Sequence, residues 1–337
     1  MNTSASRLGS LLALTLYFSV VAAIHAQQKQ EFLLPSQPTA MITGKVIDES
    51  NQPISGAEVT IDFLIGQIGS WGTRDLTHQG QTGSDGTFSA SDQTGIAASL
   101  SVTKAGHYKT YGGRYLFKAK KSGRWEPWNP TVEMILKAIV NPIPMYARRV
   151  ETATIPVMGK PIGFDLVESD WVAPHGKGSV SDLIFTLQKT FVDVEKPFEA
   201  SLTVTFANEG DGIQPTIAAP HVGSEFRLPR YAPEEGYEPK LVKSTSRAAV
   251  NQMIIPATKE DLNYFFRVRT VKKDKKIVSA YFGKIDRDID FDIINSDTAL
   301  LFFTYYLNPT PLERNMEFDP KRNLLTGLKD RETVTNP

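Results

Sequence analysis

Acidic side chains recur at every second position of one short segment, which holds Asp286, Asp288, Asp290 and Asp292. In a β-strand these residues line one face, and Arg287, Ile289 and Phe291 lie on the other. Clustered carboxylate oxygens suit Ca²⁺, but the segment lacks the glycine and the distal glutamate of a calcium-binding loop. We therefore expect a solvated strand face, partly neutralised by neighbouring Lys or Arg side chains. Calcium binding over Asp286–Asp292 stays open.

Aromatic side chains gather in two segments that we expect to be irregular, residues 66–74 and 111–128. They are Trp71, Tyr111, Tyr115, Trp125 and Trp128. Flat aromatic faces stack on the C–H surface of sugars, and aromatic anchors also dominate protein interfaces. We favour a structural role, in which the rings fasten the loops to the fold. A carbohydrate-binding site formed by these five residues is the alternative.

Recognisable catalytic devices are missing from the sequence. A catalytic zinc site of the His-x-x-Glu type is not expected, because no histidine has glutamate at the third following position and His78, His107, His175 and His221 are scattered. No Gly-x-Ser-x-Gly elbow and no phosphate-binding glycine loop is present. Acidic residues that lie close in sequence are common on strands and turns and do not by themselves predict acid–base chemistry; they are Asp165, Glu168 and Asp170, and then Glu209 and Asp211. We expect no enzyme activity, no cofactor and no metal. A hydrolase with an unrecognised site beyond residue 146 is a further alternative.

The composition indicates an ordinary globular protein. The chain has 337 residues, 41% of them hydrophobic, and its 37 Lys and Arg residues equal its 37 Asp and Glu residues. No net charge therefore attracts nucleic acid or an anionic membrane, and we expect no nucleic-acid partner. Cysteine is absent, which excludes disulfides and thiolate metal sites.

Residues 1–26 predict a secretory signal. Arg7 is followed by an apolar run from Leu11 to Ile24, and a small residue, Ala26, precedes the expected cut at Gln27. The apolar run is short for a membrane span, so we expect cleavage, export to the periplasm or the outside, and no membrane span afterwards.

Alternating apolar residues predict strands along the rest of the chain. Ala57, Val59, Ile61 and Phe63 share one face of such a segment. Strands are also expected over residues 42–47, 183–187, 202–206 and 299–307, the last buried on both faces. Two runs over 264–271 and 277–282 flank a charged tip and predict a hairpin. A short helix over Lys259–Leu262 is the exception to the β pattern.

Several of these segments carry a family resemblance. Gly44-x-Val46 with Pro53-Ile54-Ser55-Gly56-Ala57-x-Val59 resembles the start of a carboxypeptidase regulatory-like domain, a transthyretin-like β-sandwich. Thr82–Phe88 resembles the central hairpin of that family, Leu100–Tyr108 its Leu-x-Val strand with His107 inserted, and Thr131–Leu136 its closing strand. Residues 170–178 and 305–319 resemble a group of uncharacterised exported bacterial proteins. The resemblance implies a folding or docking module and no catalytic activity.

These observations predict an all-β protein made of two β-rich domains. We expect a signal peptide over 1–26, a flexible lead over 27–39, the transthyretin-like sandwich over 40–138, a proline-containing linker over 139–145, a second domain of sandwich or barrel type over 146–325, and a tail over 326–337. The predicted function is that of an exported, non-enzymatic binding or structural protein. Its partner is an envelope or extracellular protein, or a polysaccharide.

Overall fold

The computed structural model describes residues 37–66, 73–193, 196–218, 222–249, 252–294 and 297–337. The predicted signal peptide, most of the flexible lead, Trp71 and His221 lie outside these residues. The described chain is built of sheets with mostly antiparallel pairing and of two single-turn 3₁₀ helices, η1 (Pro320–Arg322) and η2 (Asp330–Glu332). The predicted all-β class is confirmed.

The chain divides into two compact units. The first contains the residues up to Ile47, Gln52–Val102 and Gly112–Met134. The second contains Asp48–Asn51, Thr103–Tyr111 and Ile135–Pro337. Each unit is described by itself below.

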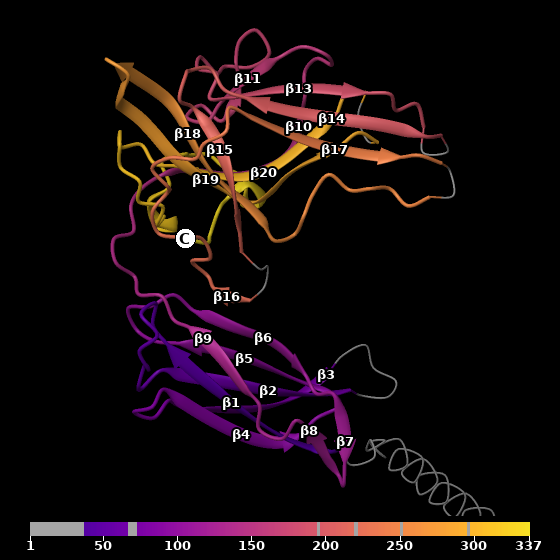
Figure 1. Cartoon of the computed structure of the whole chain (residues 1–337), viewed down its shortest axis with the longest axis vertical. Helices are drawn as coiled ribbons and strands as arrows, with labels where there is room; N and C mark the ends of the chain where they lie inside the picture. Colours follow the sequence, from indigo (N-terminus) through magenta and orange to yellow (C-terminus); the bar gives the residue numbers. More distant parts are fainter. Residues whose placement is uncertain (1–36, 67–72, 194–195, 219–221, 250–251, 295–296) are drawn as a thin grey trace, which may run out of the picture. The chain divides into compact units, whose positions relative to one another are not determined.

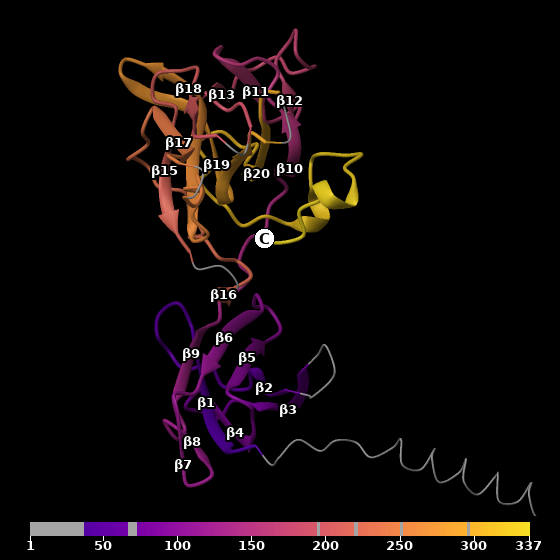
Figure 2. The ribbon, with the colours of Figure 1, turned by 90° about the vertical axis from the view of Figure 1, so that its right-hand side faces the viewer.

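The first unit holds two sheets (Figures 1 and 2). One sheet has the order β4 (Thr87–Gln93), β1 (Thr39–Ile47), β8 (Arg124–Glu126) and β7 (Ala119–Lys121), with β9 (Thr131–Ile135) also paired to β1. The other sheet contains β6 (Thr110–Leu116), β5 (Ala97–Thr103), β2 (Glu58–Gly66) and β3 (Thr73–Gln81), in that order.

In the first unit the chain passes from one sheet to the other between β1 and β2 and again between β3 and β4. β1 and β2 are consecutive, yet β1 pairs with β4 and β2 pairs with β3. The turn at 83–86 likewise joins β3 to β4 of the opposite sheet, so the expected central hairpin is wrong. Crossing brings apolar faces together: a Cβ on Gly44 of β1 would lie 3.4 Å from the side chains of Val59 and Leu100. Both strands can therefore bury one face in a shared core.

The second unit also holds two five-stranded sheets. One has the order β10 (Tyr146–Thr154), β20 (Leu300–Leu307), β19 (Lys276–Asp292), β18 (Leu262–Lys273) and β15 (Gly212–Ile217). The other has the order β12 (Asp170–Trp171), β11 (Ile162–Asp165), β13 (Leu183–Lys189), β14 (Phe198–Thr205) and β17 (Lys240–Arg247). The two-residue strand β16 (Gly223–Ser224) pairs with Tyr111 and Thr110, which also belong to the second unit.

The core of the second unit is rich in phenylalanine. Phe303 of one sheet lies 5.7 Å, ring centroid to ring centroid, from Phe164 of the other, and 5.9 Å from Phe185. The predicted strand over residues 299–307 is central, because β20 pairs with β10 on one side and β19 on the other. Burial on both faces holds only from Tyr305 to Leu307, since Leu300, Phe302 and Thr304 are partly exposed. The predicted hairpin with a charged tip is confirmed as β18 and β19.

Two local predictions are wrong. Residues Lys259–Asp261 form a turn that leads into β18 rather than a helix, and the Asp288 carboxylate accepts a hydrogen bond from the Lys259 backbone N–H at 2.9 Å. Four residues are too few to nucleate a helix without tertiary support. The segment 111–128 is not irregular, since it contains most of β6 and the hairpin β7–β8. Its glycines and lysines hid the alternation that would have indicated strands.

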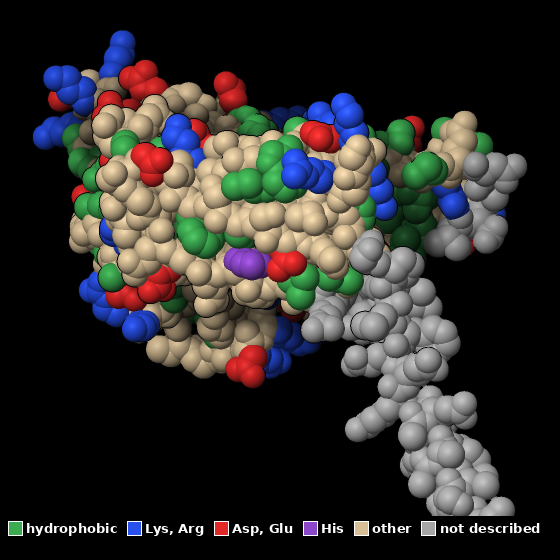
Figure 3. All heavy atoms as spheres, turned by 90° about the horizontal axis from the view of Figure 1, so that it is seen from below, with side chains coloured by type: hydrophobic (Ala, Val, Ile, Leu, Met, Phe, Trp, Pro, Cys, Tyr) green, Lys and Arg blue, Asp and Glu red, His purple; other side chains and the backbone are tan. Residues whose placement is uncertain are grey.

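Charged side chains of both signs are interspersed on the face shown in Figure 3. This mixture agrees with the equal numbers of acidic and basic residues in the sequence.

Candidate functional site

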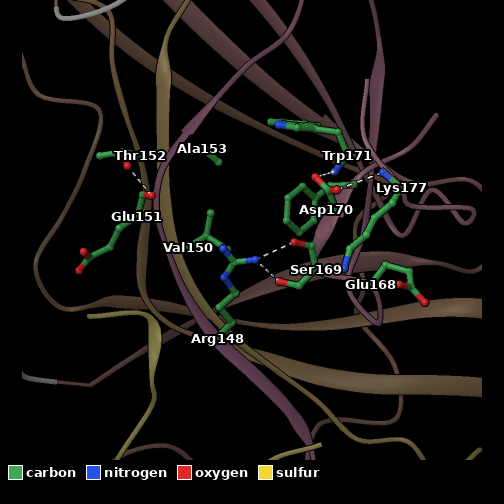
Figure 4. A pocket seen from close by; sticks show the side chains of 11 residues that line it. Arg148, Val150, Glu151, Thr152, Ala153, Glu168, Ser169, Asp170, Trp171 and Lys177 are labelled. Atoms are coloured by element: carbon green, nitrogen blue, oxygen red, sulfur yellow. Dashed lines mark hydrogen bonds between the residues drawn. The ribbon is translucent and has the colours of Figure 1, made fainter. Parts of the chain in front are cut away.

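A polar pocket opens in the second unit beside the edge strand β10 (Figure 4). Its volume is about 380 Å³. One wall is formed by Arg148, Val150, Glu151, Thr152 and Ala153 of β10. The other comes from β11, β12 and the adjoining loops, through Phe164, Glu168, Ser169, Asp170, Trp171 and Lys177. The two walls belong to different sheets, and both β10 and β12 are the outermost strands of their sheets.

Backbone irregularities occur on both walls of the pocket. The register of β10 against β20 shifts between Val150 and Ala153. Within this bulge Thr152 has φ 60°, and Ser169 on the opposite wall has φ 53°. Left-handed backbone is unusual for a β-branched residue such as threonine. Strain of this kind is concentrated at ligand-binding and active sites.

Arg148 connects the two walls of the pocket. Its Nη1 donates hydrogen bonds to the carbonyl oxygen of Ser169 at 2.7 Å and to the Ser169 hydroxyl at 3.0 Å. Its Nη2 donates to Glu332 Oε1 at 2.9 Å. A guanidinium held on two sides in this way has a fixed direction.

Asp170 organises the loop that forms the other wall. Its Oδ1 accepts the backbone N–H of Trp171 at 2.8 Å, and its Oδ2 accepts that of Lys177 at 3.0 Å. The loop passes so close to itself that a Cβ on Gly176 would lie 2.4 Å from the Trp171 carbonyl oxygen. Only glycine fits there. Figure 4 shows Lys177 and Glu168 on the same side of the pocket as Asp170.

The core side chains beneath the pocket are apolar, and its accessible lining is polar and charged. Val150, Phe164 and Trp171 are 2%, 2% and 7% exposed and belong to the core of the unit. Around them stand the guanidinium of Arg148, the ammonium of Lys177 and the carboxylates of Glu151, Glu168 and Asp170. The site therefore offers hydrogen-bond donors and acceptors, with little accessible apolar surface.

Asp165, which the sequence placed near Glu168 and Asp170, is a structural group. It is 1% exposed and accepts four backbone N–H groups, from Val167, Glu168, Ser179 and Val180. Although burial by itself raises it, these hydrogen bonds hold the pKa of Asp165 below its ordinary value. Arg269 also donates to Asp165 at 3.0 Å and binds both oxygens of Asp182 at 2.7 and 2.8 Å. The cluster joins β18 to the pocket loop, and its carboxylates are not free for catalysis.

Glu209 and Asp211 do not form a pair either. Asp211 is buried and accepts the backbone N–H of Thr270 at 2.8 Å, which fastens the turn to β18. Glu209 is exposed and pairs with Lys272 at 2.7 Å.

The predicted one-sided row of aspartates is wrong. The register of β19 against β20 shifts between Asp286 and Asp290, and Arg287 at the shift has φ 69°. The bulge breaks the two-residue alternation, so Asp288 and Ile289 are both buried. Asp288 accepts hydrogen bonds from Lys243 at 2.5 Å and from the Tyr264 hydroxyl at 2.7 Å. Within the described residues no group of three His, Asp or Glu side chains is placed to hold a metal ion.

The predicted aromatic residues have different surroundings. In the first unit, Trp125 is 4% exposed, stacks on Phe117 and donates its indole N–H to the Thr94 carbonyl oxygen at 2.8 Å. Tyr115 packs edge-on against the same Phe117 ring, so these two are brought together. Trp128 is 36% exposed beneath the guanidinium of Arg124. Tyr111 is exposed and belongs to the second unit. Carbohydrate binding by this set stays a prediction. The Trp125 ring is buried, so it has no free face on which a sugar could stack.

Sequence reasoning missed Arg148, Thr152, Ser169 and Lys177 as site residues. The one available signal was the closely spaced pair Gly176 and Gly178 after Trp171, which indicates a loop folded tightly on itself. Arg148 and Thr152 lie in an ordinary alternating strand and carry no such signal.

Comparison with known proteins identifies no family for this chain. No family model matches the chain, and no curated protein matches it. A solved structure of 3-chlorocatechol 1,2-dioxygenase from Rhodococcus opacus is 9% identical over 31% of this chain and 61% of that chain, with a TM-score of 0.25. The shaft pilin SpaA of Lactobacillus rhamnosus GG is 13% identical over 53% of this chain and 91% of that chain, with a TM-score of 0.20. At these values neither similarity bears on the function of this chain. In the described part of the chain, neither 3₁₀ helix is long or apolar enough to cross a membrane.

Proposed function

We propose that the chain is an exported, non-enzymatic binding protein that holds a small neutral saccharide in the polar pocket of the second unit. The observation that carries the proposal is the polar lining of the pocket, which holds groups of both charge signs. Sugar hydroxyls donate and accept hydrogen bonds, so they can satisfy carboxylates and cations at once, whereas a singly charged ligand would be repelled by part of the lining.

Binding rather than catalysis is supported by the state of the carboxylates. Asp165, Asp182 and Asp211 are engaged in internal hydrogen bonds, and Asp170 holds its own loop. General acid–base catalysis needs a titrating group that is free to exchange a proton with the substrate. Glu168 remains as a hydrogen-bond acceptor for ligand hydroxyls, and Glu151 lies 3.9 Å from Arg149 Nη1.

Export is supported by the signal-like sequence of residues 1–26. We expect the mature chain to begin at Gln27, which N-terminal sequencing of protein recovered outside the cytoplasm would check. Retention of residues 1–26 would contradict export with cleavage.

Membership of the carboxypeptidase regulatory-like group is proposed for the first unit. Its support is that the motif segments coincide with strands: Gly44 and Val46 lie in β1, Val59 in β2, Leu100 and Val102 in β5, and residues 131–135 are β9. A module of this kind would act in docking to an envelope or extracellular partner.

Calorimetric titration of the mature chain, residues 27–337, with neutral mono- and disaccharides tests the pocket. We expect saturable binding by one of them. The double variant Glu168→Gln/Lys177→Met, which removes two charged groups of the lining and leaves the Arg148 bridge intact, should lose affinity about tenfold or more. The matched control is Glu209→Gln/Lys272→Met, an ion pair outside the pocket, which should bind normally. Equal affinity of the two double variants would reject the pocket as the site. Cleavage of the bound saccharide would reject the non-enzymatic assignment.

A further inference from the structure

A strongly basic segment forms one end of the first unit. Residues 114–124 contain Arg114, Lys118, Lys120, Lys121 and Arg124 and no acidic residue, in a chain with equal numbers of basic and acidic residues. Four of these cations lie on or next to the hairpin β7–β8, which is closed by Ser122 and Gly123 in left-handed conformations (Figure 1).

The hairpin breaks a rule of strand pairing. Lys121 and Arg124 stand directly opposite each other across the turn. Like charges in this position destabilise a hairpin. The carboxylate next along the strand, Glu126, accepts the backbone N–H of Trp128 at 3.0 Å. Within the described residues none of the five cations of the segment forms an ion pair, and all five are exposed. A local conflict without internal compensation is typical of a functional surface.

Aromatic rings hold two of these cations in place. The guanidinium carbon of Arg124 lies 4.7 Å from the Trp128 ring centroid, and Lys120 Nζ lies 4.7 Å from that of Trp125. Contact with a ring restricts the long side chain and leaves its outer donors free. An arginine held in this way can bind a carboxylate or sulfate group with two parallel hydrogen bonds.

We propose that the hairpin β7–β8, together with Arg114 and Lys118, binds an acidic polysaccharide. Lys118 and Lys120 are two positions apart, a spacing of about 7 Å along an extended chain, and Lys121 and Arg124 are paired at the tip, so the segment offers several cations to a polymer with repeated carboxylate or sulfate groups. The exposed ring of Trp128 adds a flat face beside Arg124 for a sugar ring.

Two features favour polysaccharide over nucleic acid. Single-stranded nucleic acid is bound by several aromatic platforms in succession, whereas Trp125 is buried and only Trp128 offers a partly exposed indole on the hairpin. Export, which is part of the proposed function, also puts the chain among surface polysaccharides. Binding at the hairpin is otherwise independent of the saccharide pocket of the second unit.

Binding of the mature chain to alginate and heparin at low salt tests the proposal, with dextran as the uncharged polymer and single-stranded oligo-dT as the competing polyanion. We expect alginate or heparin to bind, with affinity that falls as salt is added, and dextran not to bind. The variant Lys121→Ala/Arg124→Ala should lose about tenfold in affinity. The matched control Lys275→Ala/Lys276→Ala removes two positive charges from the tip of another hairpin and should keep the affinity of the natural protein.

Several outcomes would overturn the proposal. They are no binding to either acidic polysaccharide, tighter binding to oligo-dT than to alginate and heparin, or an equal loss of affinity in the two double variants. Lys121→Ala alone, which leaves the contact of Arg124 with Trp128 intact, guards against a folding defect and should still weaken binding about threefold. The hairpin variant should titrate normally with the pocket saccharide, so the two sites can fail separately.

Discussion

Lys284 lies in the interior of the second unit, where it is 2% exposed. Its Nζ is 4.4 Å from the ring centroid of Tyr306 and 5.1 Å from that of Phe226. Burial lowers the pKa of Lys284 to about 7, from the ordinary lysine value of 10.5. The charged groups that act on it are Asp286, Lys137, Glu317 and Arg227. At neutral pH this ammonium is therefore on the point of losing its proton.

The stability of the protein should rise with pH because of Lys284. Between about pH 7 and 10.5 the unfolded chain keeps the lysine proton and the folded chain loses it, so each pH unit favours folding by about 1.4 kcal/mol. From pH 6 to pH 9 the free energy of unfolding should rise by about 2–3 kcal/mol more in the natural protein than in Lys284→Met. Urea denaturation at both pH values checks this, with exposed Lys276→Met as control. Parallel pH profiles for the natural protein and Lys284→Met would show that Lys284 is not the group responsible.

At the scale of elements, the bulge in β19 places the Asp288 carboxylate in the interior, where unbroken alternation would have left it exposed. There it connects the two sheets of the second unit. Asp288 of β19 receives the ammonium of Lys243 from β17 in the other sheet, and also the Tyr264 hydroxyl and the backbone N–H of Lys259. A buried carboxylate needs such a set of donors, because it has lost its water. The ion pair therefore stabilises the bulge and holds the two sheets in position against each other.

Removal of one partner of this pair should be costly. Lys243→Met leaves the Asp288 carboxylate buried without its cation, and we expect a loss of about 3–5 kcal/mol in the free energy of unfolding. The double variant Lys243→Met/Asp288→Asn removes the charge but keeps an acceptor for Tyr264, and it should be more stable than the single variant. Chemical denaturation of the three proteins measures this coupling. A double variant less stable than Lys243→Met would contradict it.

At the scale of the whole molecule, the C-terminal end of the chain is part of the second unit. Val334 is 2% exposed in a cluster with Met145, Ala147, Tyr306 and Phe318. Glu332 accepts a hydrogen bond from Arg148 beside the polar pocket. The hydrogen bonds from Lys329 N–H and Arg148 hold the pKa of Glu332 below its ordinary value, against a smaller effect of burial. The last residues thus help to support the pocket wall.

Deletion of residues 326–337 should destabilise the protein and weaken the pocket. Loss of the buried Val334 side chain alone costs about 1.5–3 kcal/mol. Arg148 also loses the carboxylate that directs it, so saccharide affinity should fall together with stability. Denaturation and calorimetry measure the two effects, with exposed Thr335→Ala as the control. A truncated protein of unchanged stability and affinity would show that this end of the chain has no structural role.

The sequence by itself determined which residues are buried where a strand alternates without a bulge, as in β2. Ala57, Val59, Ile61 and Phe63 alternate with polar residues and all four are fully buried, because the side chains of a strand point to its two faces in turn. The apolar run of β20 and the charged tip between β18 and β19 were equally readable. These features depend only on neighbours along the chain.

Only the tertiary structure decided which strands pair, where the bulges lie and which residues meet in the pocket. Alternation shows that a face is buried but not against which sheet, so the crossing between β1 and β2 could not be derived. The pocket joins Arg148 to Ser169 and Glu332, and the bulge joins Asp288 to Lys243, across long stretches of chain. Such contacts form because two sheets close on each other, and no local pattern of residue types records them.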